Sequence, residues 1–258
     1  MSDQAARRER RITAAIALAA LCGVAGLLVA AALLAKSPTS EPRVEPVPTP
    51  TTTMTPVKPV SEPVAPAPEP SGERIDATWL SNVSKQTGIG TVALEAYALA
   101  SVRLVREQPS CHVGWTTLAG IGAIESGHGT NSGSRLRADG TTSRRILGPA
   151  LDGSSGMARI PSTGQSEKWH GDSRWDHAVG PMQFIPSTWR KWGSDGSHDG
   201  TSDPNNVFDA AYSAARYLCA SGADLRTGEG WTQAIFSYNH SDDYVRSVVE
   251  RANSYVKP

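Results

Sequence analysis

The chain has 258 residues, and its 25 basic and 25 acidic side chains give it a formal net charge of zero at pH 7. A protein that binds nucleic acid usually carries a basic excess, so this balance argues against nucleic acid as a partner. The composition also changes along the chain, and we expect four parts: a basic cytoplasmic tail at 1–11, a transmembrane anchor at 12–35, a disordered linker at 36–73 and a globular domain at 74–258.

The segment from Ile12 to Ala35 is apolar and contains no charged residue. At about 1.5 Å per residue, a helix of this length measures roughly 36 Å, which exceeds the hydrocarbon core of a bilayer at about 30 Å. Arginines precede it, which predicts a cytoplasmic N-terminus and an extracytoplasmic domain on the cell-wall side of the membrane. A cleaved signal peptide is the alternative, but its apolar core usually has only about 7–15 residues.

The next segment, 36–73, is rich in proline and has no apolar periodicity. Such a sequence stays extended near polyproline II at about 3.1 Å per residue, and therefore spans up to about 100 Å. We expect a tether that lets the domain reach a layer held away from the membrane.

From residue 74 the sequence becomes globular, since all 7 Trp and all 6 Tyr of the chain lie there. Apolar residues at helical spacing predict three helices. Asn205 or Asn206 is expected to cap the N-terminus of the second helix, and Ser241 or Asp242 that of the third. The predicted buried faces are Ala93, Tyr97, Ala100 and Leu104; Phe208, Ala211, Tyr212, Ala215, Leu218 and Cys219; and Val245, Val248, Val249, Ala252 and Val256. Between 127 and 180 the periodicity is lost, which predicts a long irregular insertion with room for a short β-hairpin.

Two of the three cysteines, Cys111 and Cys219, fall in the predicted exported domain. An even pair in an oxidising compartment predicts a disulfide, and two buried free thiols are the alternative.

The segment 114–129, GWTTLAGIGAIESGHG, places a carboxyl group where a helix disfavours one. Glu125 shares a helical face with Trp115 and Leu118, and the Ser126-Gly127 pair predicts that the helix ends directly after it. Burial and the negative end of the helix dipole both favour the protonated carboxyl and raise its pKa. A general acid that works near neutral pH needs such a raised pKa.

Two later motifs contain groups that suit an amino sugar. In GPMQFIPSTW, residues 180–189, the side chain of Gln183 offers both donors and an acceptor. In AIFSYN, residues 234–239, Tyr238 extends from the apolar face of a predicted helix and Asn239 follows it. Taken alone, the first motif is compatible with an ordinary turn, and Asn239 with a left-handed helix cap.

Taken together and in this order, Glu-Ser-Gly, Gly-Pro-Met-Gln-Phe and Tyr-Asn resemble the lytic transglycosylases of the lysozyme-like superfamily. The Gln-Phe-Ile-Pro-Ser-Thr-Trp and Ala-Ala-Arg-Tyr-Leu stretches are most similar to the membrane-bound B-type enzymes, over residues 75–256. The resemblance implies a mainly α, lysozyme-like single domain of the goose-type or soluble lytic transglycosylase kind. It also implies a monomer that acts on peptidoglycan glycan strands.

The resemblance further implies cleavage of the β-1,4 bond after N-acetylmuramic acid without consumption of water. Glu125 would protonate the glycosidic oxygen and then accept the proton of the C6 hydroxyl, which closes a 1,6-anhydro ring. The residues that would hold the sugar are Met182, Gln183, Tyr217, Tyr238 and Asn239. The B-type pattern has a serine nine positions before the glutamine, and Arg174 stands there in this chain.

No cofactor is expected for this reaction, but one loop suggests a structural calcium ion. Its Asp-x-Ser-x-Asp-Gly-x run resembles the start of an EF-hand loop, and a later aspartate would close the loop as in the B-type enzymes. An ordinary surface turn is the alternative. The candidate ligands are Asp195, Ser197, Asp199, Thr201 and Asp209.

Other enzyme classes fit the sequence less well. A metallopeptidase needs clustered His ligands and a serine hydrolase of the α/β type needs a G-x-S-x-G motif, and neither pattern is present. A muramidase on the same fold, which would pass water to the intermediate, is the nearest rival. A non-catalytic peptidoglycan-binding module is the second alternative, although it would not explain the placement of Glu125.

Overall fold

The computed structural model describes residues 74–220 and 224–256. The predicted tail, anchor and linker lie outside these residues. Within the described ranges no single helix is long and apolar enough to cross a bilayer, although α2 and α3 together reach the required length and composition across a bend of 116°.

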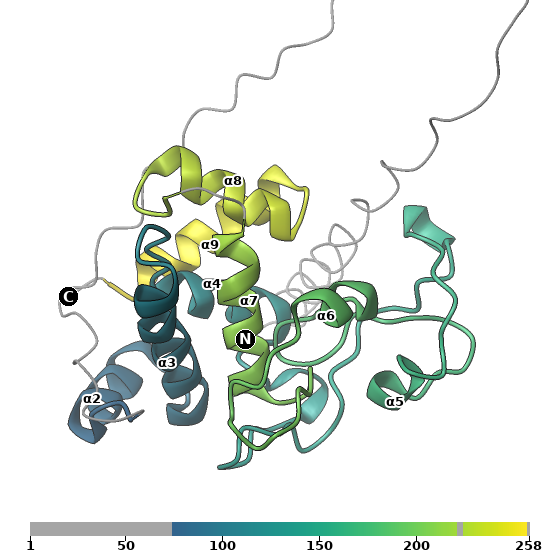
Figure 1. The fold of residues 1–258 in the computed structure, drawn as a ribbon, viewed down its shortest axis with the longest axis horizontal. Coiled ribbons are helices and arrows are strands. Elements are labelled where there is room, and N and C mark those ends of the chain that lie inside the picture. The colour runs from purple at the N-terminus through teal and green to yellow at the C-terminus, as the bar shows by residue number, and fades with distance from the viewer. Residues whose placement is uncertain (1–73, 221–223, 257–258) are drawn as a thin grey trace, which may run out of the picture.

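The described domain consists of helices joined by loops, as the sequence predicts (Figure 1). The α-helices are α2 (Ala77–Thr87), α3 (Thr91–Glu107), α4 (Trp115–Ser126), α5 (Glu167–His170), α6 (Pro186–Trp192), α7 (Val207–Cys219), α8 (Gly228–Tyr238) and α9 (Asp242–Ser254). Two short 3-10 turns, η1 (Asn131–Gly133) and η2 (Ser154–Gly156), lie between α4 and α5.

Helix α4 lies in the core and packs against α9, α3 and α7. It accepts neighbours on several sides because apolar and small residues lie around the helix, including two glycines. A Cβ on Gly120 would lie 2.9 Å from the carbonyl oxygen of Val248 in α9, and a Cβ on Gly122 would collide with the ring of Tyr97. These close contacts hold α4, and therefore its C-terminal end, at a fixed position in the domain.

The three predicted apolar helices are confirmed as α3, α7 and α9. Asn206 caps α7 by accepting the N–H of Phe208 at 2.9 Å, and Ser241 caps α9 by accepting the N–H of Tyr244 at 3.3 Å. The predicted disulfide joins Cys111 to Cys219, with Cα atoms 5.3 Å apart, and connects the loop before α4 to the end of α7.

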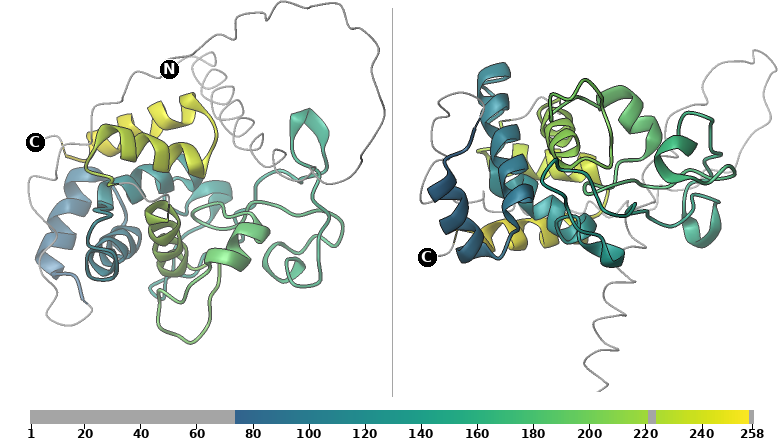
Figure 2. Two further views of the ribbon diagram at one scale, coloured as in Figure 1. Left: turned by 45° about the horizontal axis from the view of Figure 1, so that its top comes forward. Right: turned by 90° about the horizontal axis from the view of Figure 1, so that it is seen from below.

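The predicted insertion between α4 and α6 is irregular and extends away from the helices (Figures 1 and 2). The short β-hairpin allowed for it is absent from the described residues, where pairing is limited to isolated bridges such as Leu136 with Thr142 and Asp152 with Arg159. The chain turns between these partners at glycines of positive φ, Gly140 at 84° and Gly153 at 86°.

Candidate active site

Glu125 lies in the last turn of α4, which ends at Ser126 before the left-handed Gly127 (φ 57°). Trp115 and Leu118 on the same face are buried, and Glu125 is half-buried at the end of this face. The position predicted for this carboxyl, at a helix end beside the core, is therefore confirmed.

The carboxyl of Glu125 accepts a hydrogen bond of 2.6 Å from the hydroxyl of Tyr244 in α9. Burial raises the pKa of Glu125 to about 7, and the Tyr244 hydrogen bond opposes part of this rise. A carboxyl with this pKa is protonated in a large fraction of molecules near neutral pH and can also act as a base after it gives up its proton. Within the described residues, no second carboxylate contributes to this shift.

Three tyrosines extend from Glu125 as a connected aromatic surface. The ring of Tyr238 lies parallel to that of Tyr244, with centroids 6.5 Å apart, and perpendicular to that of Tyr217, with centroids 5.6 Å apart. Burial and the charge of Glu125 raise the pKa of both Tyr238 and Tyr244, so both stay neutral near pH 7. Tyr244 is buried, whereas the half-buried rings of Tyr238 and Tyr217 offer apolar surface for a sugar.

The hydroxyl groups of the two tyrosines predicted to hold the sugar are already engaged. Tyr238 donates to the carbonyl of Met182 at 2.7 Å, and Tyr217 donates to the carbonyl of Ser237 at 2.6 Å. These bonds fix both rings and leave an oxygen lone pair and the ring surface for other contacts.

Ser126 connects the end of α4 to the Gly180–Gln183 turn. Its hydroxyl donates to the carbonyl of Pro181 at 2.6 Å and accepts the N–H of Gly129 at 2.8 Å. Because Ser126 is fully buried, these two bonds are shielded from water and set the turn beside Glu125.

The same turn changes the roles predicted for two residues. The side chain of Met182 is 0% exposed and lies in the core, so its predicted contact with the sugar is not available to that side chain. Gln183 has a positive φ of 50°, and its Nε2 donates to the carbonyls of Ile146 at 3.1 Å and Gly180 at 2.9 Å. Its donor side is thus used to hold the turn, and only its Oε1 can serve a ligand as an acceptor.

Asn239 follows the end of α8 with an extended backbone (φ −146°), not the left-handed geometry considered for it. Its backbone N–H bonds to the carbonyl of Ile235 at 3.2 Å. The side-chain amide has no hydrogen-bond partner within 74–220 and 224–256, and it sits directly after Tyr238. An amide with free donor and acceptor groups suits the predicted contact with an acetamido group.

The loop predicted to bind calcium is held by its own backbone. Asp209, fully buried, accepts the N–H groups of Gly196 and Ser197 at 2.8 Å and that of Asp203 at 2.9 Å. Asp195 accepts the N–H of Gly200 at 2.8 Å. Across the described ranges no group of three or more His, Cys, Asp or Glu residues could hold a metal ion. The calcium site stays a prediction, and calcium-dependent thermal stabilisation of the full chain would be its test.

Two residues important to this geometry were not recognised in the sequence. Tyr244 is separated from Glu125 by 119 positions, and Ser126 from Pro181 by 55. In the sequence Ser126 belongs to a helix stop and to the Glu-Ser-Gly motif, neither of which indicates its bond to Pro181, and the spacing of Tyr244 matches an ordinary buried position on α9. Neither long-range contact has a local signal.

One comparison with known proteins covers part of this site. Residues 159–235 match the sequence model of the Transglycosylase SLT domain. This match bears out the predicted resemblance to the lytic transglycosylases over these residues and supports the assignment of the chain as an enzyme of that class. The segment contains Met182, Gln183 and Tyr217, whereas Glu125 precedes it and Tyr238 follows it. No curated protein matches the chain.

The solved structures that match the chain do so at low sequence identity and with TM-scores below 0.5. The Escherichia coli lytic transglycosylase Slt35 in complex with calcium is 16% identical, with a TM-score of 0.43 over 72% of this chain and 80% of that one. The same enzyme in complex with bulgecin A is 16% identical, with a TM-score of 0.40 over 71% of this chain and 79% of that one. Pseudomonas aeruginosa SltB3 in complex with NAG-anhNAM-pentapeptide is 14% identical, with a TM-score of 0.36 over 70% of this chain and 67% of that one.

Proposed function

We propose that the chain cleaves the β-1,4 bond between N-acetylmuramic acid and N-acetylglucosamine of peptidoglycan and leaves 1,6-anhydro-muramic ends. The observation that carries this proposal is the single half-buried carboxyl of Glu125, with a pKa of about 7, beside the aromatic surface of Tyr244, Tyr238 and Tyr217. A glycosidase with paired carboxylates would need a second acid within about 5–10 Å.

In the first step, protonated Glu125 donates its proton to the glycosidic oxygen, and the bond from this oxygen to C1 of the muramic residue breaks. The acetamido group of the same sugar stabilises the cation at C1. In the second step the C6 hydroxyl adds to C1 and its proton returns to Glu125, so the carboxyl ends the cycle as it began. Tyr244 donates its hydrogen bond to the intermediate carboxylate and stabilises it.

The experiment is digestion of purified sacculi by the full chain and by its Glu125→Gln variant, with identification of the fragments by mass spectrometry. We expect 1,6-anhydro-muramic ends from the wild type and a loss of at least about 100-fold in rate for the variant, as for removal of a general acid. Reducing ends one water heavier would instead identify a muramidase. Binding to sacculi without any cleavage would identify a non-catalytic module.

For the location of the enzyme, we propose a single membrane anchor at 12–35 with the domain on the cell-wall side. The length of the apolar run and the arginines before it support this proposal. Protease added to intact spheroplasts should remove the domain and leave the N-terminal segment in the membrane. Release of the whole domain into the medium would indicate a cleaved signal peptide.

A further inference from the structure

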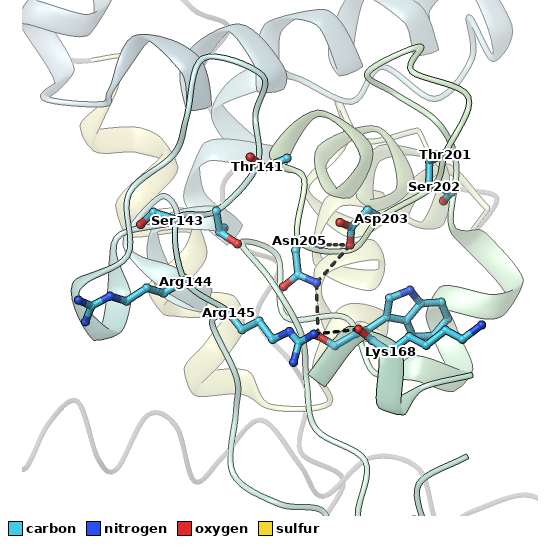
Figure 3. Close-up of a pocket in the computed structure, with 11 residues that line it drawn as sticks. Thr141, Ser143, Arg144, Arg145, Lys168, Thr201, Ser202, Asp203 and Asn205 are labelled. Carbon is cyan, nitrogen blue, oxygen red and sulfur yellow. Dashed lines mark hydrogen bonds between the residues drawn. The ribbon is translucent and has the colours of Figure 1, made fainter. Parts of the chain in front are cut away.

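A cavity of about 450 Å³ lies among residues 141–145, 168–169 and 201–205 (Figure 3). Neither Glu125 nor any of the three tyrosines of the candidate active site lines it. The side chains that adjoin these tyrosines lie elsewhere, and one of them is at the C-terminal end of α6.

Helix α6 contains two tryptophans that differ in their packing. Trp189 is 3% exposed and belongs to the hydrophobic core, where its ring centroid lies 5.2 Å from that of Phe184. Trp192 is partly exposed and belongs, among the described residues, neither to the core nor to the partly buried side chains packed against it. Core packing therefore does not account for the tryptophan at position 192.

Trp192 extends the aromatic surface of the candidate active site by one ring. Its ring centroid lies 5.7 Å from that of Tyr217, with the two planes at 87°. Tyr217 in turn contacts Tyr238, which lies parallel to Tyr244. Helix α6 packs against α7, the helix of Tyr217, so the two rings come from elements that support each other (Figure 1). The result is a continuous path of rings that leads away from Glu125, and a linear glycan has one sugar ring after another to place along it.

The indole of Trp192 also carries a hydrogen-bond donor that is open to solvent. Its N–H has no partner within 74–220 and 224–256, and it is not among the buried polar atoms there, as the indole N–H of Trp115 is. The exposed ammonium group of Lys191 lies over the same indole, 5.3 Å from the ring centroid. Aromatic surface with donors at its edge matches a sugar, which has an apolar C–H face and acceptors in its hydroxyl and acetamido groups.

We propose that Trp192 holds a sugar of the glycan strand beyond those at Tyr238 and Tyr217, and that the enzyme therefore favours long strands over short fragments. The inference rests on the proposed function, because cleavage at Glu125 fixes the position of the strand. With Tyr238 beside the sugar at the cleaved bond and Tyr217 beside the next one, Trp192 serves the third sugar on that side. The indole stacks on this sugar, and its N–H donates to a hydroxyl or acetamido oxygen.

The test compares two peptide-free substrates of alternating N-acetylglucosamine and N-acetylmuramic acid, a tetrasaccharide and an octasaccharide. The tetrasaccharide has its cleavable bond only at the centre, with two sugars on either side, so it does not reach Trp192. For the full chain we expect kcat/KM per cleavable bond to be about three- to tenfold higher on the octasaccharide, the range for one aromatic contact. The Trp192→Ala variant should bring this ratio close to one. The change should appear as a higher KM at unchanged kcat, because the contact is the same before and during cleavage.

Two further variants separate this contact from a general effect of losing a tryptophan. Trp192→Phe should keep part of the ratio, since it retains an aromatic ring and loses the N–H. The matched control, Trp175→Ala, removes a partly exposed tryptophan of the insertion, whose ring lies 5.2 Å from the guanidinium of Arg159, and should keep the ratio of the wild type. The rate on the tetrasaccharide reports correct folding and should be the same in every one of these proteins.

Equal kcat/KM per bond on both substrates in the wild type, or a ratio that Trp192→Ala leaves unchanged, would overturn the role of Trp192 and leave the proposed function intact. If the wild type cleaves neither substrate, the proposed function fails, and calorimetry of the full chain with the two oligosaccharides decides the role of Trp192 by itself. Tighter binding of the octasaccharide that is lost in Trp192→Ala supports this role. Equal binding of both oligosaccharides overturns it.

Discussion

The carboxyl of Glu125 has one hydrogen-bond donor among the described residues, the hydroxyl of Tyr244. Burial is the larger influence on this carboxyl and raises its pKa to about 7, whereas the tyrosine bond lowers it. At the scale of single residues, this balance sets the pH at which the carboxyl of Glu125 loses its proton and can no longer act as the general acid. Since the first step needs protonated Glu125, kcat/KM should fall as the pH rises through about 7.

Removing the tyrosine hydroxyl shifts this balance in a defined direction. In a Tyr244→Phe variant the influence that lowers the pKa of Glu125 is lost and burial persists, so the alkaline fall of kcat/KM should move to higher pH. The measurement is the pH profile of kcat/KM on sacculus fragments. Tyr255→Phe is the control, because that hydroxyl contacts His128 at 2.9 Å and not Glu125. An alkaline fall that stays in place or moves to lower pH would contradict the role given to Tyr244.

At the scale of elements, the site depends on how α4 is joined to the Gly180–Gln183 turn. The hydroxyl of Ser126 makes this connection through its bonds to Pro181 and Gly129. A Ser126→Ala variant would leave a buried carbonyl and a buried N–H without partners, which should reduce the free energy of unfolding by about 1–3 kcal/mol. It should also reduce kcat/KM, because the turn that carries Gln183 is no longer fixed beside Glu125.

Denaturant unfolding and activity assays of the same samples check this prediction. Ser254→Ala is the matched control, since it deletes an exposed hydroxyl that bonds only to the carbonyl of Arg251 in its own helix. We expect both quantities to stay near the wild-type values in the control. A Ser126→Ala protein as stable and as active as the control would show that other contacts position the turn.

For the whole molecule, the sequence predicts local features well and long-range contacts poorly. The helix that ends at Ser126, the cap at Ser241 and the buried face of α3 follow from short patterns, and the structure confirms them. The burial of Met182 and the bonds of Gln183 to Ile146 depend on how distant segments meet. No periodicity within one element contains that information, so the sequence could not predict the contacts that these two side chains make.

The disulfide is the long-range contact that the sequence did predict, because an even pair of cysteines in a domain predicted to be exported favours a disulfide. The bond joins residues 108 positions apart, and both cysteines are buried. In the chain-entropy model, a loop of this length stabilises the fold by about 4–5 kcal/mol, and measured values are often smaller. A Cys111→Ala/Cys219→Ala variant should therefore lose about 2–5 kcal/mol of unfolding free energy in urea.

The same loss should appear when the wild-type protein is unfolded in the presence of a reductant, and the reductant should not change the variant further. This second comparison separates the bond from the side-chain packing, because the wild-type sequence is unaltered in it. The bond anchors the loop before α4 to the end of α7, so its loss should weaken the packing that places Glu125 near the tyrosines of α8 and α9. An unfolding free energy that is the same with and without reductant would mean that helix packing alone holds α4 and α7 together.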